Sequence, residues 1–276
     1  MGAEKKVVNV AGESKMEVRL LDKTKDGKVS FLLKGSDVFY ANTIRRLMIE
    51  EVPVMAIEDV EIRDNSSALY DEILAHRLGL VPLKTDLKSY NLLEECTCKG
   101  QGCAKCTLTL TLTAKGPGMV YASDLKSKDP KVKPVFPKMP IVELFKDQKL
   151  KFEATAVLGK GIDHAKFSPG LFFYKNKPVI EILKKDAITE ECVKACPKKI
   201  FVLKNKKVEI DKDKALTCDL CNVCVEACKG AIKVEPLEND IIFYVESFGQ
   251  LSPREIVVKA VEILDTKIKD FDKLLK

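Results

Sequence analysis

The sequence predicts an α+β protein of several small domains, and three observations support that prediction. Apolar and polar residues alternate along the middle of the 276-residue chain, as they do in antiparallel strands. Near both ends, apolar residues recur every three or four positions, as they do in helices. The ten cysteines fall into two groups, Cys96–Cys106 and Cys192–Cys228, so both ends lack cysteine. At roughly 100–200 residues per domain, the length allows one large domain or a few small ones.

The composition excludes several classes of protein. The chain has 47 Lys and Arg against 41 Asp and Glu, and because these charges form no basic block, direct sequence-specific DNA contact is not expected. No apolar stretch reaches the roughly 18–20 residues of a membrane span, and residues 1–15 lack the apolar core of a signal peptide. We therefore expect a cytoplasmic protein without membrane contact. In that reducing compartment, ten closely spaced cysteines indicate metal or iron–sulfur ligands before disulfides.

The first 52 residues predict two strands followed by a helix. The strands and the turn between them occupy three segments: Met16–Leu21, Asp26–Gly27 and Val29–Leu33. Ser36 or Asp37 can cap the helix, and Val52–Pro53 ends it. Four apolar residues repeat at helical spacing within it: Ala41, Ile44, Leu47 and Met48.

The middle of the chain predicts a half-buried antiparallel sheet. Three alternating segments are expected as strands: Val54–Ile62, Leu108–Leu112 and Leu150–Leu158. A helix interrupts them, with Asp71 and Glu72 in its first turn and Gly79 at its end. Three apolar residues are expected on one side of that helix: Leu69, Ile73 and Leu78. Four prolines predict an extended linker in the same region: Pro130, Pro134, Pro137 and Pro140.

The last segment predicts an apolar strand, Ile241–Val245, and then a long helix. Ser252–Glu255 spells a capping box with Pro253 at the first helical position. Six apolar residues then recur every three or four positions: Val257, Ala260, Leu264, Ile268, Phe271 and Leu275. A helix of about 24 residues is roughly 36 Å long, which is long for a small domain. Part of its apolar stripe is therefore expected against another chain, and burial within this chain is the alternative.

The second cysteine group contains an iron–sulfur motif. Four cysteines spell C-x2-C-x2-C-x3-C: Cys218, Cys221, Cys224 and Cys228. With this spacing, three thiolates of one loop bind a cubane and the fourth reaches a different cluster. Upstream, Cys192–Pro197 matches the second half of the same motif, and the two segments align at an offset of 32 residues. This internal repeat indicates a ferredoxin-like module.

The repeat also suggests which cysteines bind iron. In a two-cluster ferredoxin, each cluster takes three cysteines from one motif and the last cysteine of the other. One complete set is present: Cys196, Cys218, Cys221 and Cys224. It predicts one 4Fe-4S cluster, which oxidation can convert to a 3Fe-4S form. The second set is half missing, because Asp186 and Thr189 stand where cysteines are needed. Cys192 and Cys228 are then expected near each other, as thiols or a disulfide; a zinc or purely structural site is the alternative for the whole group.

The first cysteine group predicts a different site. Four cysteines spell C-x-C-x4-C-x2-C in a loop that contains Gly100 and Gly102: Cys96, Cys98, Cys103 and Cys106. Four thiolates closing tetrahedrally on one ion would be a structural zinc site. An empty, degenerate site is the alternative, and an iron–sulfur cluster is less favoured because the first spacing is short. The two histidines, His76 and His164, belong to no set of nucleophile and base, so no catalytic residues are expected.

Several sequence runs resemble one known family. The runs that carry the resemblance are Phe39–Met48, Glu51–Pro53, Leu69–Glu72, His76–Leu83, Asp163–Phe167 and Glu246–Gly249. They are similar to the alpha-like assembly subunits of cellular RNA polymerases. With a ferredoxin-like module, the chain most resembles the archaeal members of this family, the counterparts of bacterial alpha, over nearly its whole length from about Met16. One departure is Lys229, which follows Cys228 where a ferredoxin often has proline.

The resemblance implies three domains. Both chain ends, residues 1–52 and 234–276, would form a two-part dimerisation domain. Residues 53–174 would form a sheet-rich insert domain that carries the four-cysteine loop at 96–106. Residues 175–233 would form the ferredoxin-like iron–sulfur domain.

The resemblance also implies a function. The chain would be a noncatalytic assembly subunit of the DNA-dependent RNA polymerase, a nucleotidyltransferase complex that carries out transcription. It would form a heterodimer with the small subunit L, on which subunits N and P and the large catalytic subunits assemble. Six residues are expected at partner contacts: Ile44, Arg45, Arg46, Met48, Leu264 and Ile268. On pattern alone, Arg45 and Arg46 favour a solvated helix face. The alternative function is a ferredoxin-type electron-transfer protein, although the companion cluster that such a protein commonly uses is incomplete here.

Overall fold

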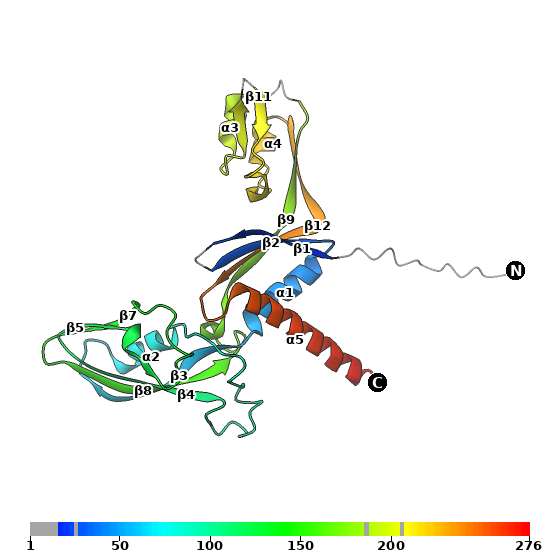
Figure 1. Ribbon diagram of the computed structural model, residues 1–276. Coiled ribbons are helices and arrows are strands. Elements are labelled where there is room, and N and C mark those ends of the chain that lie inside the picture. The colour runs from blue at the N-terminus through cyan, green and yellow to red at the C-terminus, as the bar shows by residue number, and fades with distance from the viewer. Residues whose placement is uncertain (1–15, 25–26, 185–187, 205–206) are drawn as a thin grey trace. The chain divides into compact units, whose positions relative to one another are not determined.

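The computed structural model describes residues 16–24, 27–184, 188–204 and 207–276 (Figure 1). The chain divides into two compact units. Unit 1 comprises Met1–Leu21, Ser30–Ala41 and Tyr174–Phe243, and unit 2 comprises Asp22–Val29, Asn42–Phe173 and Tyr244–Lys276. The polar stretch 1–15, Asp26 of the predicted turn and Asp186 lie outside the described residues. The division into three domains stays a prediction.

Unit 2 contains an antiparallel sheet at its centre. Its strand order is β3 (Val54–Asn65), β8 (Lys149–Gly159), β4 (Thr107–Lys115) and β6 (Lys126–Ser127). On β4 and most of β8, buried residues alternate with more exposed ones, whereas β3 begins with four buried residues in a row, Val54–Ile57. Residues of all three strands belong to one buried apolar core. The three predicted strands of the middle region are therefore confirmed. The alternating pattern marks β4 and β8 because each has one buried and one more exposed face, and the apolar start of β3 is buried on both faces.

The helix α2 (Asp71–Gly79) has the predicted start and end but a different buried side. Leu74 and Leu78, four residues apart, are its buried residues, whereas Ile73 is 50% exposed. The expectation for Ile73 was wrong because Leu69 lies before the helix and does not set the helical phase.

The proline-rich segment is part of the fold of unit 2. Pro134 pairs with Leu83 in an isolated bridge, and Pro140 begins β7 (Pro140–Leu144), which pairs with β5 (Gly118–Tyr121). A short 3-10 turn, η1 (Ala122–Asp124), follows β5. Only part of this segment is therefore a linker.

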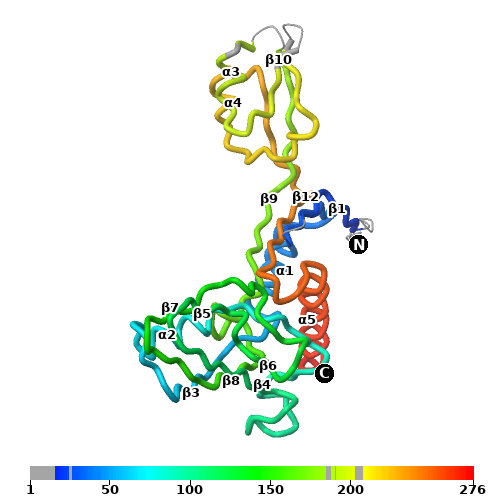
Figure 2. The backbone as a smooth tube through the Cα atoms, turned by 60° about the vertical axis from the view of Figure 1, so that its left-hand side comes forward, coloured from blue at the N-terminus to red at the C-terminus, as the bar shows by residue number. Residues whose placement is uncertain are grey.

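A second sheet has the order β1 (Glu17–Lys23), β2 (Lys28–Lys34), β12 (Ile232–Ser247) and β9 (Gly170–Ile182). The 3-10 turn η2 (Ala165–Phe167) precedes β9. β12 begins nine residues before the predicted strand Ile241–Val245. Its first half is mostly exposed, with only Ile232 and Val234 buried, and it lies next to β9 in the sheet, so a continuous apolar run did not mark it. Figure 2 shows β9 and β12 running side by side into the cysteine module, defined here as residues 175–233.

The cysteine module consists of short elements. They are α3 (Glu190–Ala195), β10 (Phe201–Lys204), β11 (Lys207–Ile210), η4 (Ala215–Thr217) and α4 (Val223–Ala227). β10 and β11 form an antiparallel hairpin. Of the eleven described residues that form the buried cluster of this module, five are cysteines, so thiol groups make up much of its interior.

Both predicted helices of the chain ends are present. In α1 (Val38–Glu50), Asp37 is the cap, because its Oδ1 accepts a hydrogen bond of 2.7 Å from the backbone N–H of Tyr40. α5 (Pro253–Leu274) opens with the predicted capping box: Ser252 N–H donates to Glu255 Oε2 at 2.9 Å, and Ser252 Oγ accepts from Glu255 N–H. None of the helices among the described residues is long and apolar enough for a membrane span.

Candidate metal centres and partner surfaces

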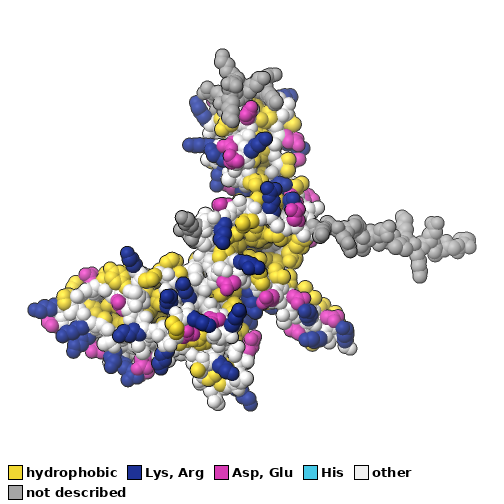
Figure 3. Space-filling model, in the orientation of Figure 1, with side chains coloured by type: hydrophobic (Ala, Val, Ile, Leu, Met, Phe, Trp, Pro, Cys, Tyr) yellow, Lys and Arg dark blue, Asp and Glu magenta, His cyan; other side chains and the backbone are white. Residues whose placement is uncertain are grey.

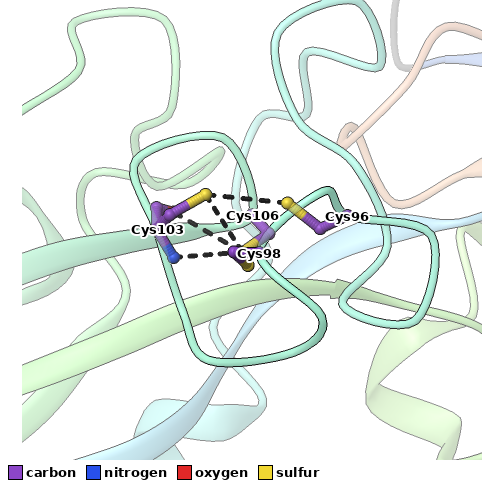
Figure 4. A group of neighbouring side chains, drawn as sticks. All are labelled: Cys96, Cys98, Cys103 and Cys106. Atoms are coloured by element: carbon purple, nitrogen blue, oxygen red, sulfur yellow. Dashed lines mark hydrogen bonds between the residues drawn. The ribbon is translucent and has the colours of Figure 1, made fainter.

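The four cysteines at 96–106 converge in space, in the loop before β4 (Figure 4). Their sulfur atoms all lie within 4.8 Å of one another. Three of the separations are 3.6 Å for Cys96–Cys103, 3.5 Å for Cys98–Cys106 and 3.8 Å for Cys103–Cys106. With zinc–sulfur bonds of about 2.3 Å, the edge of a regular tetrahedron of sulfurs is about 3.8 Å. The four thiols therefore have the spacing of a four-coordinate metal site and could hold a metal ion.

Local backbone turns bring these cysteines together. Lys99 N–H donates to Cys96 O at 2.9 Å, and Cys106 N–H donates to Cys103 O at 2.9 Å, so each pair closes a tight turn. Gly100 and Gly102 both have φ of 80°, a conformation that glycine adopts without steric cost. Gly100 and Gly102 thus allow the backbone to bend back between the two pairs of cysteines.

The four thiols differ in how readily they ionise. Hydrogen bonds from Cys96 and the other two thiols lower the pKa of Cys98 to about 6, against the effect of burial. Burial raises the pKa of Cys106 to about 12. Four thiolates in one place repel each other, and a divalent cation among them compensates that repulsion. The chemistry of this donor set fits a soft or borderline metal ion such as zinc.

The second site is a small cavity in the cysteine module. It has a volume of about 70 Å³, and all four predicted iron ligands line it: Cys196, Cys218, Cys221 and Cys224. Neither Cys192 nor Cys228 lines it. Apolar side chains, including Ile200 and Phe201, form other parts of the wall. Four of the six cysteines of the module thus share the wall of one cavity, and their assignment as iron ligands stays a prediction.

The loop 218–224 wraps part of this cavity. Leu220 and Asn222, on either side of Cys221, have φ of 58° and 59°, so the backbone turns sharply at both positions. Lys175 Nζ donates to Cys218 O at 2.8 Å, and Lys198 forms an ion pair of 3.0 Å with Asp219. Burial, followed by the neighbouring thiols, raises the pKa of Cys224. Burial likewise raises the pKa of Cys218, so these two thiols become harder to ionise, and a bound cation would lower the energy of their thiolates.

Cys192 and Cys228 contact each other as free thiols. They are 1% and 3% exposed. Burial raises the pKa of Cys228 to about 12, and the neighbouring Cys192 adds to that rise. Burial opposes ionisation of Cys192, but hydrogen bonds from Cys228 and Thr189 outweigh it and lower the pKa of Cys192. The side chains of Cys192 and Cys228 thus lie close together, and their role as a thiol or disulfide pair stays a prediction.

The expected partner contacts are only partly available. Ile44 and Met48 are 4% and 0% exposed, because α1 turns these side chains into the chain's own core, and they were wrong as contact residues. Arg46 is exposed and pairs with Glu50 at 3.1 Å, and Arg45 donates to Asn42 Oδ1 at 3.1 Å. Both arginines thus have partners on their own helix, as the solvated-face interpretation expects.

Helix α5 presents the two other expected contacts. Leu264 is half-buried and Ile268 is 57% exposed. Sequence reasoning did not single out Val261, which is 42% exposed and, with Leu264, continues the spacing of four and three residues. We define the α5 seam as the five residues at that spacing: Val261, Leu264, Ile268, Phe271 and Leu275. Counting apolar residues at alternating spacings of three and four, as in a heptad repeat, would have included Val261.

The two histidines have local roles. His164 Nδ1 accepts a hydrogen bond of 3.0 Å from Lys166 N–H and caps η2. His76 lies exposed in the last turn of α2.

Comparisons with known proteins agree on one family. A family model described as the RNA polymerase Rpb3/RpoA insert domain matches residues 60–171. The chain is 42% identical to the DNA-directed RNA polymerase subunit Rpo3 of Methanosarcina acetivorans over 258 residues, which cover 92% of this chain and 96% of the relative. It is 40% identical to the subunit of the same name from Archaeoglobus fulgidus, with 94% of this chain and 98% of the relative covered. The Pyrococcus furiosus subunit is also 40% identical, at 93% and 95% coverage.

Proposed function

The chain belongs to the family of DNA-directed RNA polymerase subunit Rpo3, and on that premise we propose that it is a noncatalytic assembly subunit of an archaeal RNA polymerase. In this role it pairs with the small subunit L, and the pair is the platform for subunits N and P and for the large catalytic subunits. In this proposal, the subunit assembles with the polymerase in the cytoplasm and makes no sequence-specific contact with DNA. The alternative of an electron-transfer protein has no support among these relatives.

The observation that carries this proposal is the α5 seam. Three of its members, Ile268, Phe271 and Leu275, are 57%, 62% and 70% exposed. Apolar residues at spacings of three and four form the seam along which one helix packs against another. A soluble chain seldom exposes several large apolar side chains in one row unless a partner covers them. A helical partner, as a second subunit of a heterodimer would provide, fits this row.

Unit 1 exposes further apolar side chains. Met16, just before β1, and Val18 and Leu20, within β1, lie at alternate positions and are 46%, 64% and 60% exposed. Phe39, in the first turn of α1, is 84% exposed. On the face in Figure 3, hydrophobic side chains gather in the region of β1 and α1. A second subunit would remove this surface from water as well.

The test of the proposal is co-expression with the small subunit. Replacing two seam residues, Leu264→Glu with Ile268→Glu, places two charges where the partner would exclude water. We expect the one-to-one complex to weaken by roughly a hundredfold or more, measured by size-exclusion chromatography and titration. The matched control is Thr266→Glu, because position 266 is about 200° around the helix from both seam residues. Equal binding of the small subunit by the seam variant and the control would contradict the proposal. A wild-type chain that is a stable monomer and does not bind the small subunit would contradict it as well.

In the same proposal, the loop 96–106 holds one zinc ion. The support is the tetrahedral spacing of its four sulfurs, at 3.5 to 3.8 Å for three pairs. Four protein ligands leave no open position for substrate, so the ion would stabilise the fold. The loop hydrogen-bonds to the rest of unit 2 through Asn91, whose N–H donates to Lys105 O at 2.8 Å.

The cysteine module, in this proposal, holds one 4Fe-4S cluster. Its ligands are Cys196, Cys218, Cys221 and Cys224, and the support is that these four sulfur ligands line one cavity. The cluster would hold the two halves of the module together, and oxidation could convert it to a 3Fe-4S form. The cations of Lys175 and Lys198 lie beside the loop and would offset part of the negative charge of a thiolate-bound cluster.

A further inference from the structure

Unit 2 contains a large groove that the proposed function does not use. Its volume is about 1060 Å³, above the usual range of 300–1000 Å³ for small-molecule pockets. One wall is formed by residues 84–88 with Lys131, Val135 and Phe136. The facing wall is formed by the first turns of α5, where Arg254, Val258 and Glu262 follow each other at intervals of four. The size of this groove favours a segment of polypeptide over a metabolite.

The walls of the groove are held in place by the chain itself. The loop 247–251 joins them, because Thr85 N–H donates to Gln250 O at 3.0 Å. Within that loop, Ser247 Oγ donates to Leu251 O and accepts from Gly249 N–H at 2.9 Å. Gly249 has φ of 92°, and a Cβ at that position would overlap Val135 Cγ1. The groove is therefore preformed, which lowers the entropic cost of binding.

One buried polar atom in the groove lacks a partner. Gln250 is 5% exposed, and its Oε1 accepts no hydrogen bond within the described ranges of the chain. Buried side-chain acceptors nearly always accept a hydrogen bond, so the unpaired Oε1 of Gln250 indicates that a bound partner supplies the donor. The terminal torsion of a glutamine side chain is soft, so its amide can turn toward a donor in the groove. The backbone N–H of an extended segment is such a donor.

The groove also has an apolar part and an excess of positive charge. Phe136, Phe248 and Val258 are 51%, 43% and 46% exposed within it. Of the charged lining residues, Asp86 pairs with Lys131 at 2.8 Å and Glu262 with Lys259 at 3.5 Å. The Glu255 carboxylate is engaged in the helix cap, and the nearby charge of Lys88 contributes to lowering its pKa.

Two cations are left over. Lys84 and Arg254 are exposed and form no ion pair within the part of the chain that the structure describes. A polyanion such as nucleic acid would meet the three carboxylates among the lining residues, which disfavour it. A peptide with an acidic and an apolar side chain complements both kinds of surface.

We propose that this groove binds an extended segment of another polymerase subunit, one that carries an acidic residue for Lys84 or Arg254 and an apolar residue for Phe136, Phe248 and Val258. The segment donates a backbone N–H to Gln250. This inference rests on the proposed function, because it takes the partner to be a subunit of the same polymerase.

A photo-crosslinking experiment tests the inference in the assembled polymerase. The variant Val258→p-benzoylphenylalanine carries the probe in the groove, and Phe145→p-benzoylphenylalanine carries it at a 58% exposed position that does not line the groove. We expect the groove probe alone to capture an acidic, apolar segment of another subunit, identified by mass spectrometry. Capture of nucleic acid, capture of this chain's own residues, or no capture by the groove probe in intact polymerase would overturn the inference. If no polymerase subunits co-purify with the wild-type chain, the proposed function itself fails, and this inference fails with it.

A charge-reversal pair gives an independent measurement. Lys84→Glu with Arg254→Glu should weaken retention of the captured subunit about tenfold, while binding of the small subunit to the α5 seam is unchanged. The matched control is Lys128→Glu with Lys138→Glu, two exposed lysines of the same unit outside the groove. Equal retention by the two double variants would overturn the inference.

Discussion

Replacing Cys221 by serine tests the proposed iron–sulfur site with the least disturbance of packing. Cys221 is exposed, whereas the other three proposed ligands are buried. Serine keeps the size of the side chain but removes the thiolate that binds iron. The iron content of protein purified without oxygen should therefore fall from about four atoms per chain toward none.

The loss should also unfold the module. Five of the eleven described residues in its buried cluster are cysteines, so few large apolar side chains remain to hold it. Structural metal sites contribute on the order of 10 kcal/mol to folding, which is comparable to the whole stability of a small domain. Trypsin should then cut rapidly at lysines that are exposed in this module, such as Lys199, Lys212 and Lys229. The α5 seam lies outside the module, so the complex with the small subunit should survive while assembly of the full polymerase weakens.

The controls for this test are Cys192→Ser and Cys228→Ser, made singly. Neither residue lines the cavity, so each variant should keep an iron content near four per chain. Iron and sulfide analysis together with the visible absorption of the cluster measures the outcome. An iron content near eight in the wild type, or loss of the absorption in Cys192→Ser, would refute the single-cluster assignment. Asp186 or another residue would then have to be a ligand.

Two further predictions concern the zinc loop and the contact between α5 and Glu51 within unit 2. The double variant Cys103→Ser with Cys106→Ser should lose about one zinc per chain while keeping its iron and sulfide, because the two sites share no ligand. Wild-type protein that contains no zinc when purified without chelators would exclude the zinc site. Glu51→Gln should lower the free energy of unfolding by about 1 kcal/mol at pH 7, because the Glu51 carboxylate accepts a hydrogen bond of 2.6 Å from Lys267 on α5. That bond lowers the pKa of Glu51, so its contribution is full above the unfolded pKa and is lost as the pH falls through the folded pKa. Urea titrations should therefore show the gap between wild type and variant closing below about pH 4, and a gap that widened in acid would contradict the assignment.

The cysteine sites could be predicted because ligand spacing is a local property of the sequence. All four cysteines of the first site lie within eleven residues, three proposed iron ligands lie within seven, and the 32-residue repeat suggested Cys196 as the fourth. The helix caps were equally local: Asp37 and Ser252 each bond to a backbone N–H three residues ahead. Such features depend on a few neighbouring residues, so the rest of the fold cannot easily override them.

The faces of the helices could not be predicted in the same way. Periodicity shows that a helix has an apolar side but does not say whether its own chain or another covers it. Ile44 and Met48 are covered by this chain, whereas Ile268 is not, although all three follow the same pattern. The early start of β12 was missed for a related reason, because its first half buries only Ile232 and Val234 and is otherwise a neighbour of β9 with exposed side chains.

The two halves of the cysteine repeat differ at one position in a way that bears on the cluster count. Thr189 aligns with Cys221, the exposed thiol of the complete set. In the structure Thr189 is the N-cap of α3, where its hydroxyl accepts a hydrogen bond from Cys192 N–H, whereas α4 has no such side-chain cap at Asn222. A capping hydroxyl contributes about 1 kcal/mol to its helix. The position that would supply a ligand to a second cluster thus already stabilises α3, and Cys192 beside it is packed in the core at 1% exposure. A second cluster would need both arrangements to be undone, so the local structure itself favours one cluster per chain.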